Sequence, residues 1–215
     1  MKTCFFLLLF SLTTLYSFHS ETLVTDKITG NYIESGPIIT EENTGICINS
    51  AEARLADLIN DYRRSKKLPP IILSVSLTKV ARMHAEDLDK NYKAGGNCNL
   101  HSWSKDARWS SCCYTPDHKR AACMWDKPRE LTSYKGDGYE IAYFSNFSYA
   151  DEDEFVKDAL AGWKSSRGHN DIIINNGKWK TSGWKAMGVA VQGDYAVVWF
   201  GELADPEGKP GLCLN

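Results

Sequence analysis

The sequence lacks an excess of charge of either sign. Its 215 residues carry 25 Lys and Arg against 27 Asp and Glu, which gives a formal net charge of -2. Domains that bind nucleic acid or an anionic membrane surface usually carry a cluster or excess of basic residues. We therefore expect no nucleic-acid partner and no electrostatic attachment to a membrane.

The sequence also lacks the short motifs that identify several large enzyme classes. It contains no Gly-x-Ser-x-Gly nucleophile elbow, no His-Glu-x-x-His zinc motif and no phosphate-binding glycine loop. Internal repeats and low-complexity tracts are missing as well. Any chemistry in this chain must come from residues that are far apart in the sequence.

Long hydrophobic runs are missing except at the N-terminus. There, Lys2 is followed by the short apolar run 5–10. A basic start and a short apolar run are typical of a signal peptide, and the run is too short to anchor the chain in a bilayer. We predict a signal peptide over residues 1–20, a flexible leader over 21–46 and no integral membrane span. The mature protein is then extracellular, or periplasmic in a Gram-negative source.

Cysteine is present in a number that indicates disulfide bonds. Cys4 lies in the predicted signal peptide, and an even number of cysteines remains in an exported chain. The remaining six are Cys47, Cys98, Cys112, Cys113, Cys123 and Cys213. Six cysteines allow 15 pairings. Adjacent Cys112 and Cys113 rarely bond to each other, while Cys47 and Cys213 are placed to join the two ends. A zinc site is the alternative, but the spacing lacks the paired Cys-x-x-Cys of structural zinc.

Helical periodicity comes first in the chain and strand-like runs come last, which predicts an α+β fold. Ser50 is placed to cap the first helix. A long loop held by disulfides is expected between the second and third helices, over about 97–135. The predicted helices are 50–67, 76–94 and 151–166, and the predicted strands are 186–191 and 195–200, joined by a turn at 192–194.

Two of the histidines in the mature chain have unremarkable sequence surroundings. His84 lies on the apolar stripe of the second helix, and we interpret it as a partly buried structural residue rather than a catalytic one. His118 lies between Asp117 and Lys119 and is expected to be solvated.

Three other polar residues have a sequence context that suggests a site. His101 follows Cys98 closely, so a disulfide would hold it rigidly. Gly168 is expected to end the third helix in a left-handed conformation and to direct His169 away from the helix axis. Glu140 lies in an apolar run, where a carboxylate needs a partner.

Two imidazoles and one carboxylate suit a divalent metal such as zinc with an open coordination position. The candidate ligands are His101, Glu140 and His169. They are separated by tens of residues, and no spacing rule brings them together. From the spacing alone, three unconnected residues are the preferred interpretation.

The order of the segments adds a family resemblance. Val80 to Ala85 is followed by His101-Ser102, by Tyr139-Glu140-Ile141-Ala142, by Trp163 with Gly168-His169, and by a terminal strand pair. This order resembles the CAP superfamily (cysteine-rich secretory, antigen-5 and pathogenesis-related proteins), particularly its bacterial form. The resemblance implies a three-layer α-β-α sandwich with a central antiparallel sheet. It places a CAP domain over 47–215 that carries a disulfide-rich insertion at about 97–135.

The resemblance also implies a central cleft. Two histidines of the family's cleft, which bind a divalent metal in several members, match His101 and His169, and the family's glutamate matches Glu140. Ile141 stands where the family has asparagine, and Ser165 and Ser166 stand where many members have a second glutamate. These matches predict a module that binds a small hydrophobic ligand such as a sterol or another lipid, an extracellular protein partner, or a divalent metal. The alternative is a metal-assisted, peptidase-like hydrolase with Glu140 as its base.

Overall fold

The computed structural model describes residues 45–214. The predicted signal peptide and nearly all of the predicted leader lie outside these residues, so both stay predictions. The elements, in chain order, are β1 (Cys47–Ile48), α1 (Ser50–Ser65), α2 (Val75–Asn91), α3 (Ala122–Trp125), α4 (Lys127–Leu131), β2 (Tyr139–Phe144), α5 (Glu152–Ser165), α6 (Arg167–Ile173), the short 3₁₀ helix η1 (Gly177–Trp179), β3 (Ala186–Gln192), β4 (Tyr195–Gly201) and β5 (Gly211–Leu212).

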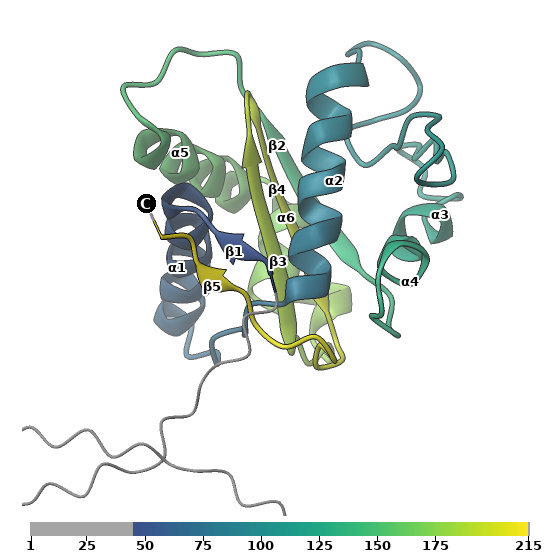
Figure 1. The fold of residues 1–215 in the computed structure, drawn as a ribbon. Coiled ribbons are helices and arrows are strands. Elements are labelled where there is room, and N and C mark those ends of the chain that lie inside the picture. The colour runs from purple at the N-terminus through teal and green to yellow at the C-terminus, as the bar shows by residue number, and fades with distance from the viewer. Residues whose placement is uncertain (1–44, 215) are drawn as a thin grey trace, which may run out of the picture. The chain divides into compact units, whose positions relative to one another are not determined.

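A central antiparallel sheet separates two layers of helices. Its strand order is β2-β4-β3, and α2 covers one face while α1 and α5 cover the other (Figure 1). This arrangement confirms the predicted α-β-α sandwich. A second, two-stranded parallel sheet joins β1 near the start of the described chain to β5 near its end.

The middle strand shows how the sequence fills both layers. Alternate residues of β4 point to opposite faces of the sheet. Ala196, Val198 and Phe200 pack with the core under α1 and α5. Val197 and Trp199 pack with the core under α2. The whole strand is buried, because helices cover both faces, so its residues form a continuous apolar run without polar alternation.

The helix α2 lies unusually close to β3. The residues of β3 that face it are small, namely Ala186, Gly188 and Ala190. A Cβ at Gly188 would lie 2.0 Å from the backbone carbon of Leu77 and 2.2 Å from its oxygen. Backbone atoms cannot rotate out of the way, so only glycine allows the helix to reach this depth.

We expect Gly188→Ala to destabilise the protein by about 1–3 kcal/mol, the range for overpacking a core. The added methyl group must push α2 away from the sheet. Urea unfolding measures the loss. Gly211→Ala is the matched control, because it adds the same methyl group to a strand glycine with no atom within 4 Å. Equal unfolding midpoints for the two variants would contradict the close packing.

The helix boundaries refine the sequence prediction. Asn49, not Ser50, caps α1, because its side chain accepts from the amide of Glu52 while Glu52 accepts from the amide of Asn49. The second helix begins at Val75, one residue earlier than predicted, since Ser74 provides its cap. The third predicted helix is α5, and the two predicted late strands are β3 and β4.

All six cysteines within residues 45–214 form disulfides, as predicted. Cys47 pairs with Cys213, Cys98 with Cys113, and Cys112 with Cys123. The adjacent residues Cys112 and Cys113 therefore have different disulfide partners. The region 97–135 is more than a loop, because it contains the short helices α3 and α4.

The expectation for Gly168 is wrong. The residue lies inside α6 rather than at a left-handed helix end. The break comes two residues earlier at Ser166, whose extended backbone ends α5 and begins α6. His169 is therefore presented from the first turn of a new helix.

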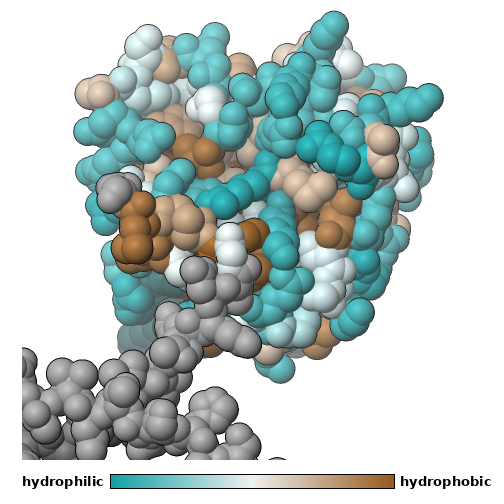
Figure 2. Space-filling view, in the orientation of Figure 1, coloured by the Kyte–Doolittle hydropathy of each residue, from teal (hydrophilic) through white to brown (hydrophobic). Residues whose placement is uncertain are grey.

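The surface of the described residues is mainly hydrophilic in the orientation of Figure 1. Figure 2 shows a hydrophobic patch beside the C-terminal end of the chain, where Leu212 and Leu214 are exposed. Within residues 45–214, no helix has the length and apolar character that crossing a membrane requires.

Candidate functional site

Glu140 is the centre of a buried polar cluster. It lies on β2 opposite Trp199 of β4, and its side chain is 0% exposed. An ionised carboxylate at this depth is costly unless it is paired and hydrogen-bonded. Two imidazoles meet this need, because one carboxylate oxygen contacts His84 and the other contacts His101.

His84 connects the cluster to the helix α2. Its Nδ1 bonds to Glu140, and its Nε2 lies 3.0 Å from the carbonyl oxygen of Ser102. A carbonyl oxygen only accepts, so Nε2 carries a proton, and an ionised Glu140 requires a second proton on Nδ1. The ring is thus an imidazolium. It stacks on Trp103 at 4.4 Å with an interplanar angle of 8°.

The electrostatics of this pair agree with the proton positions. Burial alone would lower the pKa of His84, but the carboxylate of Glu140 outweighs it and raises the pKa above its ordinary value. Burial alone would raise the pKa of Glu140, but the charge of His84 and the hydrogen bonds from both imidazoles lower it. Each charge therefore keeps the other ionised inside the core.

His101 is the member of the cluster that reaches the surface. Its Nδ1 lies 2.8 Å from Glu140, and its side chain is 17% exposed. The backbone amide of His101 donates to the side chain of Asn99, and Tyr114 packs edge-on at 5.2 Å. In the neutral tautomer whose Nδ1 donates to the carboxylate, Nε2 carries a lone pair, and no hydrogen-bond partner of this atom lies within residues 45–214.

His169 comes from α6 and lies beside His101. The two ring centroids are 6.3 Å apart. Burial, and then the nearby His101, lower the pKa of His169 to about 4. The ring is therefore neutral at pH 7, and it makes no hydrogen bond to any residue that the structure describes.

The structure thus brings the three predicted site residues into one region. His101 bonds to Glu140, and His169 faces His101 without touching Glu140 by a hydrogen bond. Both oxygens of Glu140 are engaged by imidazole nitrogens. Across the described range 45–214, no group of three or more His, Cys, Asp or Glu side chains is arranged to hold a metal ion.

His84 is the cluster member that sequence reasoning interpreted as merely structural. It is fully buried rather than partly buried. Its position on the apolar stripe of α2 signalled burial, but no pattern connected it to Glu140, which is 56 residues away. The one sequence signal that could have paired His84 with Glu140 is that both lie at positions predicted to be buried, where an imidazole and a carboxylate each need a partner. His118 is exposed, as predicted.

Comparisons with known proteins agree with this architecture. The family model described as "CAP: Cysteine-rich secretory protein family" matches residues 56–197. No curated protein matches the chain.

Three solved bacterial structures are similar to the chain. A cysteine-rich secretory protein from Staphylococcus aureus has 18% identity and a TM-score of 0.44, with 76% of this chain and 40% of that one covered. An extracellular SCP-domain protein from Bacillus anthracis has 19% identity and a TM-score of 0.47, with 79% and 45% covered. An outer surface protein from Borrelia burgdorferi has 16% identity and a TM-score of 0.47, with 71% and 92% covered. The chain thus spans less than half of the staphylococcal and Bacillus proteins.

Proposed function

Because the chain belongs to the cysteine-rich secretory protein (CAP) family, we propose that it is an extracellular binding module whose cleft is formed by His101 and His169. Three disulfides support an oxidising location outside the cytosol. Sterols, other lipids, protein partners and divalent metals are the ligands that the family resemblance implies. Of these ligands, the nitrogen lone pairs of His101 and His169 favour a divalent cation such as zinc, because a sterol or another lipid would need an apolar wall instead.

One observation carries this proposal: the hydrogen bond from Nδ1 of His101 to Glu140. A metal-binding histidine almost always donates its other ring N–H to a carboxylate or carbonyl, which fixes the tautomer and the ring orientation. Here the bond leaves Nε2 of His101 available beside the unbonded ring of His169. The two histidines would supply two nitrogen ligands to a cation, whose remaining positions would be filled by solvent or by the bound molecule, while Glu140 orients His101 and does not coordinate. A bound cation would supply Lewis acidity to whatever ligand shares the cleft.

Calorimetry with ZnCl₂ on metal-stripped protein tests the proposal. We expect the wild type to take up zinc, and the double variant His101→Ala with His169→Ala to take up none. Glu140→Gln should weaken zinc binding by about 10–100-fold, the usual cost of losing the carboxylate behind a ligating histidine.

The control is His118→Ala, which removes an exposed imidazole outside the cleft and should leave uptake unchanged. Circular dichroism confirms that each variant is folded. Unchanged zinc uptake in the double variant would show that the cation binds elsewhere.

A hydrolase is the second candidate, because a buried carboxylate that orients a histidine is also the arrangement of a general base. The side chain of Glu140 is 0% exposed, so His101 rather than Glu140 would take the proton from water. A peptide-hydrolysis assay on the same double variant tests this candidate. Any hydrolysis at this cleft must disappear when His101 is removed.

A further inference from the structure

The turn that follows α6 contains the only Asn-Gly pair in the sequence, Asn176-Gly177. It connects α6 to the 3₁₀ helix η1, and both of its residues are exposed. Asparagine is one of the chemically labile side chains of proteins. We propose that Asn176 is a site of spontaneous covalent modification, at which the backbone nitrogen of Gly177 displaces the side-chain amide nitrogen as ammonia and leaves a mixture of aspartate and isoaspartate.

The reaction needs no partner other than water. The nitrogen of Gly177 bonds to Cγ of Asn176 and gives up its proton, while the bond from Cγ to Nδ2 breaks and the amide nitrogen leaves with that proton as ammonia. The product is a succinimide ring, which water then opens. Attack of water at Cγ gives aspartate with the normal backbone. Attack at the main-chain carbonyl carbon gives isoaspartate, whose backbone runs through the former side chain and is longer by one carbon atom.

The structure leaves the attacking nitrogen available. The backbone amide of Gly177 donates no hydrogen bond to any residue described between positions 45 and 214, as expected for the first N–H of a helix. Gly177 has no Cβ to shield its nitrogen. The backbone of Asn176 is extended, with ψ 168°, so the amide that follows it is not part of a helical ladder.

Asp171 of α6 holds the carboxamide of Asn176 beside this nitrogen. The Nδ2 of Asn176 donates to Oδ1 of Asp171 at 2.8 Å, and the backbone amide of Asn176 donates to the carbonyl oxygen of Asp171, also at 2.8 Å. A Cβ at Gly177 would lie 3.2 Å from Oδ2 of the same carboxylate. The two reacting groups are therefore held together in one short turn, which favours an intramolecular reaction.

The modification removes contacts that fix the turn. A carboxylate at position 176 cannot donate to Asp171, and two ionised carboxylates at hydrogen-bond distance repel each other. In the isoaspartate form, the added backbone atom also shifts the start of η1. Trp179 of η1 packs edge-on against Tyr139 of β2, with ring centroids 4.8 Å apart, and packs against Trp184 as well. Modified chains should therefore lose part of the packing between η1 and the sheet.

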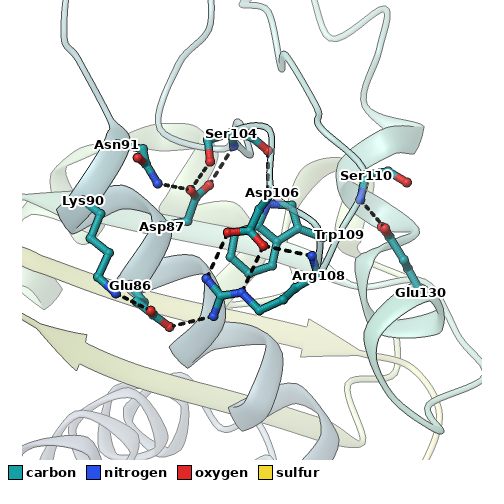
Figure 3. Close-up of polar contacts among 10 residues, drawn as sticks. All are labelled: Glu86, Asp87, Lys90, Asn91, Ser104, Asp106, Arg108, Trp109, Ser110 and Glu130. Carbon is teal, nitrogen blue, oxygen red and sulfur yellow. Dashed lines mark hydrogen bonds and ion pairs between the residues drawn. The ribbon is translucent and has the colours of Figure 1, made fainter.

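Asn91, the last residue of α2, is the matched comparison within the same chain. It is exposed, and its side chain also donates to an aspartate, Asp87, as Figure 3 shows. The amide of the next residue, Tyr92, donates to the carbonyl oxygen of Leu88 and is therefore engaged. We expect Asn91 to stay unmodified under conditions in which Asn176 reacts, because a hydrogen bond to aspartate is common to both and a free following amide is not.

Incubation of the folded mature chain at pH 8, followed by tryptic peptide mapping, tests the proposal. The peptide 168–178 also contains Asn170 and Asn175, so one spectrum compares three asparagines. We expect conversion at Asn176 alone, and faster conversion at pH 8 than at pH 6, because the attacking amide must lose its proton. The variant Asn176→Gln should lose the conversion, since its longer side chain closes a larger ring more slowly.

The effect on the fold is measured by urea unfolding. The converted protein should have a lower midpoint than Asn176→Gln incubated in parallel. Three results would overturn the proposal. One is an unmodified Asn176 in the folded chain when the synthetic peptide 168–178 reacts under the same conditions, which would show that the fold protects the turn. Another is earlier conversion at Asn91 or at any other asparagine. The third is an equal midpoint for the converted protein and Asn176→Gln.

Discussion

Replacing His84 by alanine is expected to lower the free energy of unfolding by about 3–5 kcal/mol, the cost of removing one partner of a buried ion pair. The imidazolium of His84 neutralises Glu140, donates to the carbonyl of Ser102 and stacks on Trp103. Alanine leaves a cavity beside Trp103 and leaves the buried carboxylate with one imidazole instead of two. Urea unfolding at pH 6 measures the loss.

The control for this change is His118→Ala. His118 is exposed and its Nδ1 shares a hydrogen bond with the hydroxyl of Tyr114, so its loss should cost about 0.5 kcal/mol or less. A cost below about 1 kcal/mol for His84→Ala would contradict this prediction. It would show that solvent or His101 takes over the contact with Glu140, so that the ion pair does not stabilise the fold.

The difference in unfolding free energy between the wild type and His84→Ala has a defined pH dependence. The folded pKa of His84 is raised, so its contribution is complete below its ordinary pKa near 6.5 and is lost as pH rises through the folded value. The folded pKa of Glu140 is lowered, so its contribution is complete above about 4.3 and is lost as pH falls through the folded value. The difference between wild type and variant should therefore be largest between these limits. The lowered pKa of His169 is common to both proteins and cancels.

The sequence predicted the long helices better than it predicted the contacts between them and the sheet, and the layered arrangement came from the family resemblance. Periodicity located α1, α2 and α5, because each presents one apolar stripe to a sheet. The strand β2 gave no alternating pattern, since helices cover both faces of the sheet and its residues are mostly apolar or aromatic. The two-residue strands β1 and β5 are too short to leave any periodic signal.

The histidine cluster shows the same limit at the level of single residues. Local sequence predicted that His84 is buried and that Glu140 needs a partner, but 56 residues separate them and only the fold makes them neighbours. The place of His169 in the site came from the family resemblance. The backbone conformation next to His169 was predicted incorrectly, because Gly168 lies within the helix α6 and does not adopt the left-handed conformation that glycine allows. The neighbours of these histidines are set by the packing of α2 on the sheet and of α6 against α5, which no single segment of the sequence specifies.

The second large effect is expected from the Cys47–Cys213 disulfide. It joins residues 166 positions apart, and it links β1 to β5, which are held together by only two residue pairs. In the chain-entropy account, a cross-link stabilises more when the closed loop is longer, with about 3 kcal/mol for 15 residues and nearly 5 for loops above 100. Cys47→Ser with Cys213→Ser should therefore lower the free energy of unfolding by about 4–5 kcal/mol.

The Cys98–Cys113 bond is the internal control, because it closes a loop of only 15 positions. Its double serine variant should lose about 2 kcal/mol less than the variant of the terminal pair, as the logarithm of the loop lengths requires. Guanidinium unfolding of the two variants measures the difference. A larger loss for Cys98–Cys113 would show that this bond stabilises the folded segment around it rather than restricting the unfolded chain. The order of the two losses thus separates an entropic role at the two ends of the domain from a packing role within the segment 98–113.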